Sequence, residues 1–188
     1  MKRLILLSTL VLGLVSIFSA AAAETPEEFS TRYFESMRRN GMRDMVNFIH
    51  PDELKKLADF ITEIADAEAR DGKTESVPFL KNGETLESLR KLPSAEIANK
   101  FLVWVGEVAP QLTQMLRTAE VKTVGHVTDG DTVYVVAKLS FTMDGEVINA
   151  TDVLQLRRDG ENFKMLLKAE MTGILKAMKK ATVAKAKK

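Results

Sequence analysis

One acidic residue stands on an otherwise apolar strand face, and it is the strongest candidate in the chain for acid–base chemistry. Asp152 alternates in step with Ile148, Ala150, Leu154 and Leu156, and alternate residues of a strand point to one face. Burial on that face favours the protonated carboxyl, which could act as a general acid or base. The alternatives are a structural Asp152 near the rim, paired with an arginine or capping a loop amide, or an Asp152 turned to solvent by a bulge.

Four aromatic residues are candidates to line an apolar pocket together with Asp152. They are Tyr33, Phe101, Trp104 and Phe141. Tyr33 could bring a hydroxyl into such a pocket and Trp104 could line its mouth, although buried core positions are the alternative for both. The nine methionines suit either a core or an adaptable hydrophobic cavity, because the thioether side chain fills irregular gaps.

The two histidines offer little for catalysis or metal binding. His50 directly precedes Pro51 and is predicted to cap a helix, whereas His126 shares parity with Lys122 and Val124 on the face that we expect to be more exposed. Neither histidine stands in a metal-binding spacing. The chain has no cysteine, which excludes disulfides, thiol catalysis and thiolate metal sites. It also has no phosphate-binding or dinucleotide fingerprint, so we predict no metal and no cofactor.

The first half of the chain has the periodicity and the end signals of helices. Thr25-Pro26-Glu27-Glu28 combines an N-cap, a proline at the first helical position and a capping box, and Asn40-Gly41 ends that helix. We expect Ser94 to cap a longer helix, which Pro110 kinks or restarts. The other predicted helices cover residues 42–48, 51–69 and 85–91, with a loop over 73–84.

The second half changes to a period of two. Four strands are predicted, over residues 120–128, 132–143, 146–157 and 162–168. Asp-Gly dipeptides separate them, and Asp-Gly is a strong hairpin signal because glycine accepts a positive φ. Three successive hairpins specify an antiparallel meander. The sequence therefore predicts an α+β fold, with N-terminal helices packed on a curved four-stranded antiparallel meander.

Two stretches of the chain resemble the NTF2-like superfamily. One is the opening helix with its continuation Asn40-Gly41-Met42-Arg43-Asp44-Met45-Val46-Asn47-Phe48-Ile49-His50-Pro51-Asp52. The other is the meander from Val124 to Gly160 with its closing strand Phe163-Lys164-Met165. The resemblance implies helices packed into the concave side of a curved sheet. The superfamily includes isomerases, dehydratases, lipid carriers, transport factors and many exported domains, so the resemblance implies a fold and leaves both a binding role and acid–base catalysis open.

The resemblance also implies that a homodimer could form through the outer face of the sheet. That face is apolar enough for such a contact. Its apolar members are predicted to be Tyr134, Val136, Val147, Val153 and Leu166.

Residues 1–23 have the three-part layout of a secretory signal peptide. A basic start, Met1-Lys2-Arg3, precedes an apolar run from Leu4 to Phe18 and small residues up to Ala23. The apolar run is short for a membrane anchor, which is the alternative. We expect cleavage near Ala23 and a periplasmic or extracellular protein. The predicted organisation is one domain over 24–170 followed by a basic helical or frayed tail over 171–188.

The charge of the chain is unevenly distributed. It has 27 basic and 26 acidic residues, and the body left after removal of the signal and the tail keeps 19 basic against 26 acidic residues. This balance is not typical of nucleic-acid binders. The tail could contact an anionic membrane surface, or it could be a solvated terminus. Its lysines are Lys176, Lys179, Lys180, Lys185, Lys187 and Lys188.

Together these features predict an exported, non-catalytic binding or interaction domain. Its partner would be a small hydrophobic ligand, held between the sheet and the helices, or an envelope protein. The alternatives are an enzyme that uses Asp152 as an acid or base, in the manner of an isomerase or dehydratase, and an envelope-associated structural protein that uses its basic tail.

Overall fold

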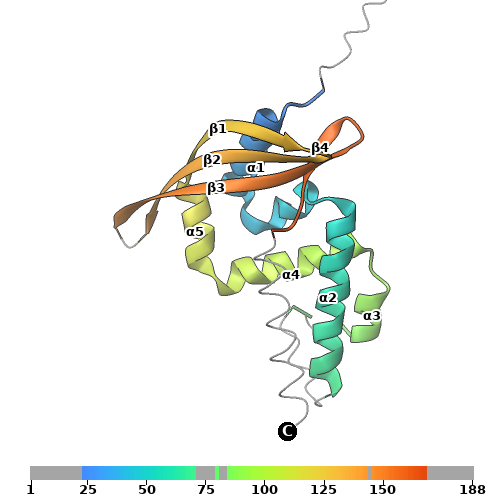
Figure 1. Cartoon of the computed structure of the whole chain (residues 1–188). Coiled ribbons are helices and arrows are strands. Elements are labelled where there is room, and N and C mark those ends of the chain that lie inside the picture. The colour runs from blue at the N-terminus through green and yellow to red at the C-terminus, as the bar shows by residue number, and fades with distance from the viewer. Residues whose placement is uncertain (1–22, 71–78, 81–83, 144, 169–188) are drawn as a thin grey trace, which may run out of the picture.

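The structure, a computed structural model, describes residues 23–70, 79–80, 84–143 and 145–168 (Figure 1). Helical elements come first, and four strands follow them in an antiparallel meander with the order β1-β2-β3-β4. The predicted α+β fold class is therefore confirmed. The helical elements are α1 (Pro26–Asn40), η1 (Gly41–Phe48), α2 (Pro51–Arg70), α3 (Leu86–Arg90), α4 (Ser94–Val108) and α5 (Pro110–Thr118). The strands are β1 (Glu120–Asp129), β2 (Thr132–Met143), β3 (Glu146–Asp159) and β4 (Asn162–Met165).

The first helix begins and ends as the sequence predicts. Thr25 accepts a hydrogen bond from the backbone N–H of Glu28 at 3.2 Å, and the Glu28 carboxylate accepts one from the Thr25 N–H at 2.8 Å. This reciprocal pair satisfies two backbone donors that the helix itself leaves free. Gly41 ends α1 with a φ of 64°, a left-handed conformation that glycine adopts without steric cost.

The long helical segment after residue 93 begins at a different cap from the one predicted. Pro93, not Ser94, is the N-cap of α4, and its carbonyl accepts hydrogen bonds from Glu96 and Ile97. The Ser94 prediction is wrong because the helix starts at Ser94 itself, one residue earlier than a serine cap would need. Val108 is 57% exposed rather than packed. Pro110 does restart the helix, as α5.

The sheet follows the predicted hairpins but ends early. The turn glycines Gly130, Gly145 and Gly160 all have positive φ values, as hairpin turns require. β4 stops at Met165 instead of continuing to residue 168. Beyond this end the Leu166 N–H still donates a hydrogen bond to the Gln155 carbonyl of β3 at 2.7 Å, and the Leu166 side chain is buried, with 9% of it exposed.

A β-bulge in β1 overturns the predicted orientation of His126. Thr123 pairs with Ala137 and Gly125 pairs with Val136, so Val124 has no partner and the register shifts. Beyond the bulge His126 pairs with Val135, which is fully buried. His126 therefore lies on the helix-facing side of β1, because one extra residue moves every later side chain to the other face.

Two hydrophobic clusters hold the molecule together. The sheet cluster joins the inner face of the sheet to α1 and η1, and the helix cluster lies among α2, α3 and α4 (Figure 1). Three partly buried side chains, Val46, Leu54 and Leu167, pack against both clusters. The inner face of the sheet is the side that packs on α1, and the outer face is the opposite side.

Candidate functional site

The inner face of the sheet is covered unevenly along its length. On β2, Val133, Val135 and Ala137 are buried, whereas Leu139 and Phe141 on the same face are only half-buried. Their cross-strand partners on β3 are Ala150 and Ile148, which are also half-buried. The β2–β3 hairpin thus carries four apolar inner-face residues that the helices cover incompletely. We call Leu139, Phe141, Ile148 and Ala150 the hairpin-end apolar surface.

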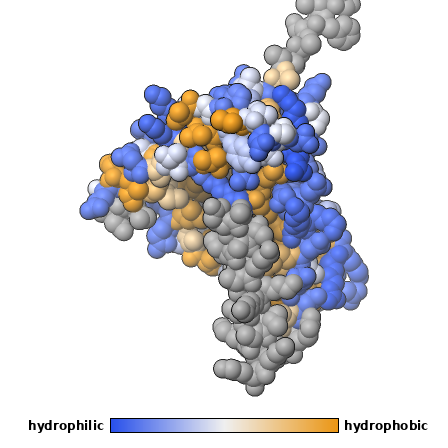
Figure 2. Space-filling model, in the orientation of Figure 1, coloured by the Kyte–Doolittle hydropathy of each residue, from blue (hydrophilic) through white to orange (hydrophobic). Residues whose placement is uncertain are grey.

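Helix α5 lies beside this surface. It contacts β2 and, although it is amphipathic, it contains no fully buried residue. Its apolar side chains Leu112, Met115 and Leu116 are all half-buried. Figure 2 shows apolar surface continuing beneath this end of the sheet. At this end of the sheet, both the strands and α5 therefore leave apolar side chains half-exposed. Farther along the inner face of β2, Val133, Val135 and Ala137 are buried.

Asp152 lies at the end of the hairpin-end apolar surface that is farther from the β2–β3 turn, which we call its inner end. It pairs across the sheet with the fully buried Ala137, so its predicted place on the inner face is confirmed. Its Oδ1 accepts hydrogen bonds from the Lys168 ammonium and, at 2.9 Å, from the Val153 N–H. The ion pair with Lys168 agrees with a structural role for Asp152, but the partner is a lysine and not the predicted arginine.

Tyr33 lies close to this charged pair. Its ring is buried among Phe29, Phe34 and Phe48. Burial raises the pKa of Tyr33, and the nearby Asp152 carboxylate raises it further, because a second negative charge disfavours the phenolate. The structure thus brings Tyr33 and Asp152 together at one end of the apolar surface whose other end carries Phe141.

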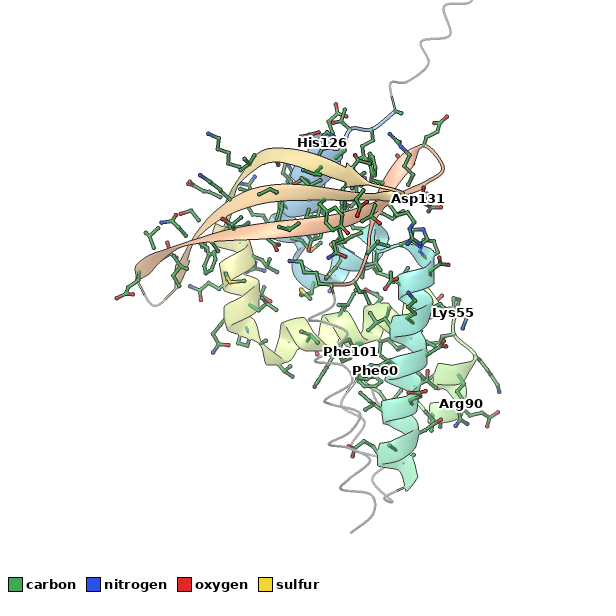
Figure 3. The ribbon with its side chains drawn as sticks, in the orientation of Figure 1. Lys55, Phe60, Arg90, Phe101, His126 and Asp131 are labelled. Atoms are coloured by element: carbon green, nitrogen blue, oxygen red, sulfur yellow. The ribbon has the colours of Figure 1, made fainter. Side chains whose placement is uncertain are left out.

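Phe101 and Trp104 belong to a different part of the molecule. They stand on α4 and form an aromatic group with Phe79, with ring centroids 5.7–6.3 Å apart. Figure 3 places Phe101 near Phe60 of α2, well away from His126 on the sheet. This packing explains the burial of Phe79. The structure therefore separates these two aromatic candidates from Tyr33, Phe141 and Asp152.

Both histidines have structural partners. His50 caps α2: its Nδ1 accepts a hydrogen bond from the Asp52 N–H at 3.2 Å, and its carbonyl accepts from Glu53 and Leu54. His126 Nδ1 lies 2.6 Å from the Glu27 carboxylate of α1, and this hydrogen bond lowers the pKa of Glu27. Within the described residues no cluster of three or more ligand-type side chains could hold a metal ion.

Two surface hollows were not predicted from the sequence. One, of about 510 Å³, lies where the sheet meets the start of α1, and its lining includes His126, Arg158 and Phe163. The Arg158 guanidinium covers the Phe163 ring there, 4.3 Å from its centroid. The other, of about 550 Å³, includes Lys122 and Lys138. The sequence did contain a signal for the second hollow, because the register of the predicted hairpins could have placed these two lysines side by side.

The outer face of the sheet keeps most of its predicted apolar character. Val147 is 66% exposed, Val153 is exposed, and Tyr134 and Val136 are half-buried. Apolar patches are visible on the sheet among hydrophilic neighbours in Figure 2. The homodimer predicted through this face stays a prediction.

The two ends of the chain lie outside the described residues. These ends carry the predicted signal peptide and the lysines of the tail, so both remain predictions, as do the domain boundaries that depend on them. Across the part of the chain that the structure describes, no helix combines the length and the apolar character that crossing a bilayer requires.

Comparison with known proteins leaves the family open. The chain matches no protein-family model, and searches of curated proteins and of solved structures give no significant match.

Proposed function

We propose that the protein is a non-catalytic binding protein of the NTF2-like superfamily that takes an apolar ligand on the hairpin-end apolar surface. The observation that carries the proposal is the uneven cover of the inner face, since four apolar strand residues and the facing side of α5 stay half-exposed. An apolar ligand placed there would remove this surface from water, at about 25 cal/mol per Å² of apolar area.

The charged end of the site gives the ligand an orientation. The Asp152–Lys168 pair stands at the inner end of the surface, and neither side chain is fully buried. A ligand with a polar group at one end and an apolar body, such as a fatty acid, fits this arrangement. Its polar group would lie at the ion pair and its apolar body on the hairpin-end apolar surface. The ion pair also supports a binding role over an acid–base role, because the Asp152 carboxylate is already engaged by the Lys168 ammonium and by the Val153 N–H.

Export supports the same function. A soluble carrier is useful outside the cytoplasm, where apolar molecules must cross water between membranes. The proposed export rests on the layout of residues 1–23.

A pair of adjacent substitutions on β3 tests the proposal. Ile148 lies on the hairpin-end apolar surface and Val147 lies on the outer face. Ile148→Thr should weaken binding of palmitic acid about fivefold, because a hydroxyl replaces apolar contact worth about 1 kcal/mol. Displacement of the fluorescent probe N-phenyl-1-naphthylamine by palmitic acid measures the affinity.

Val147→Thr is the matched control, since it makes the same kind of change on the neighbouring residue and keeps a β-branched side chain in the strand. It should leave the affinity unchanged. Two outcomes would show that the hairpin-end apolar surface is not the binding site. One is an equal affinity of both variants for palmitic acid, and the other is a failure of palmitic acid to displace the probe from the unmodified protein.

A further inference from the structure

Two lysines face each other across the outer face of the sheet. Lys122 of β1 and Lys138 of β2 are direct cross-strand partners, and Thr151 of β3 continues the same row. Side chains in such a pair have Cβ atoms about 5 Å apart, and like charges in this position are destabilising. Both lysine side chains are exposed. The protein therefore maintains an unfavourable contact where a neutral pair would be more stable.

The other cationic cross-strand pair of the sheet shows how the chain can offset such a contact. Arg157 and Lys164 are partners between β3 and β4. The Asp52 carboxylate lies 3.9 Å from the Arg157 guanidinium, and Lys164 donates a hydrogen bond to the Asn47 carbonyl at 2.7 Å. Among the residues that the structure describes, Lys122 and Lys138 form neither a salt bridge nor a hydrogen bond.

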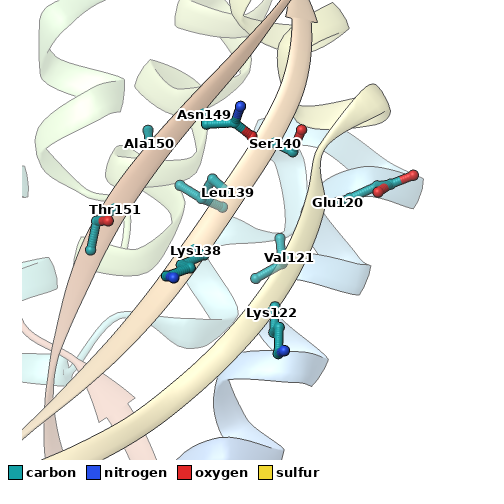
Figure 4. A pocket seen from close by; sticks show the side chains of 9 residues that line it. All are labelled: Glu120, Val121, Lys122, Lys138, Leu139, Ser140, Asn149, Ala150 and Thr151. Carbon is teal, nitrogen blue, oxygen red and sulfur yellow. The ribbon is translucent and has the colours of Figure 1, made fainter.

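The lysine pair lines a hollow that also presents neutral donors. The hollow measures about 550 Å³ and includes Ser140, Asn149 and Thr151. Hydroxyl and amide groups of these residues can donate hydrogen bonds to an oxyanion. Glu120 also lines the hollow, but Figure 4 shows its carboxylate turned away from the two lysines. Two lysines and three residues with neutral hydrogen-bonding side chains thus line one hollow.

We propose that this hollow binds a phosphate group between Lys122 and Lys138. Ammonium groups bind phosphate as point charges, and a phosphate there would convert the repulsion between the lysines into two attractive contacts. Free phosphate and the phosphate of a lipid headgroup present the same chemistry. The next row of the sheet contains Val136 and the exposed Val153, apolar side chains that suit the lipid source. The two lysines lie on the opposite face of the sheet from the hairpin-end apolar surface, although Leu139 and Ala150 of that surface also line the hollow. Phosphate binding at the lysines does not require the apolar ligand.

The test compares two double variants that lose the same charge. Lys122→Gln with Lys138→Gln removes the proposed site, and Lys55→Gln with Lys56→Gln removes two lysines of α2 that do not line the hollow. The amide spectrum of the ¹⁵N-labelled protein is followed during titration with inorganic phosphate, with chloride at equal ionic strength as the reference. Sedimentation with phosphatidylglycerol vesicles, compared with phosphatidylcholine vesicles, tests the lipid source.

We expect saturable shifts at the amides of residues 122, 138 and 151, or sedimentation with phosphatidylglycerol vesicles. The affinity measured in either assay should fall at least tenfold in the Lys122/Lys138 double variant and stay unchanged in the Lys55/Lys56 double variant. Saturation by inorganic phosphate would identify a free-phosphate site, and lysine-dependent sedimentation alone would identify a headgroup site. Equal responses from both double variants, or no phosphate-specific response in either assay, would overturn the proposal.

Discussion

At the scale of single residues, the charged pair and the buried phenol beside it explain why the inner end of the site is held in place. Asp152 bonds both Lys168 and a backbone N–H, and Tyr33 is fixed by the rings of Phe29, Phe34 and Phe48. Strand parity alone predicts that Asp152 faces the helices. It does not predict Lys168 as its partner, because that contact depends on the point where β4 ends and the chain turns.

The raised pKa of Tyr33 gives the protein a measurable alkaline instability. The folded state holds the phenol proton to higher pH than the unfolded chain, whose tyrosine has a pKa near 10.0. This contribution to stability is complete below pH 10 and is lost as the pH rises above it, at up to about 1.4 kcal/mol per pH unit. Urea unfolding between pH 9 and 11.5 measures the slope.

Tyr33→Phe should reduce that slope by the equivalent of about one proton. Tyr134→Phe, on the outer face of the sheet, is the matched control and should keep the slope of the unmodified protein. If the three proteins lose stability in parallel with pH, the burial of the Tyr33 hydroxyl does not carry the effect.

At the scale of elements, the capping box at the start of α1 makes a separable contribution. Thr25→Ala removes the hydroxyl that accepts from the Glu28 N–H, and we expect a loss of about 1 kcal/mol in the free energy of unfolding. Thr31→Ala serves as the control because the Thr31 hydroxyl bonds a carbonyl inside the same helix. That variant should change stability by no more than about 0.5 kcal/mol. Urea denaturation that ranks the two losses in the reverse order would contradict the capping role.

Some elements of the fold can be predicted from the sequence because neighbouring residues determine them. Caps and tight turns depend on residues that are neighbours in the sequence, so the sequence correctly predicts the Thr25 N-cap and the glycines of the hairpin turns. The bulge at Thr123–Gly125 depends on how β1 pairs with β2, and the single extra residue reverses the side on which His126 lies. The separation of Phe101 and Trp104 from Tyr33 depends on how α4 packs in space, which periodicity along one helix does not encode.

At the scale of the whole molecule, the sheet presents two faces of different chemistry. The inner face carries the proposed apolar-ligand site, and the outer face carries the lysine pair and exposed valines. The helix cluster of α2, α3 and α4 contributes few side chains to either surface. Its role follows from the three side chains that also pack on the sheet cluster, Val46, Leu54 and Leu167, because these contacts fix the orientation of the helices relative to the sheet.

These shared contacts should make the two clusters unfold together. Trp104, the single tryptophan of the chain, packs on the helix cluster, so its fluorescence reports that cluster alone. Amide signals of β2 report the sheet cluster. In the unmodified protein both probes should follow the same urea transition, which is the standard test for two-state unfolding.

Leu54→Ala should separate the two transitions. Leu54 packs on both clusters and Leu86 only on the helix cluster, and both are half-buried. Each change to alanine removes the same atoms and should cost about 1–2 kcal/mol, less than for a fully buried leucine. Leu86→Ala should lower both transitions together, whereas Leu54→Ala should leave the sheet signals and the Trp104 fluorescence with different midpoints. Coincident midpoints in Leu54→Ala would mean that the clusters are coupled through other contacts, and that Leu54 contributes stability without joining them.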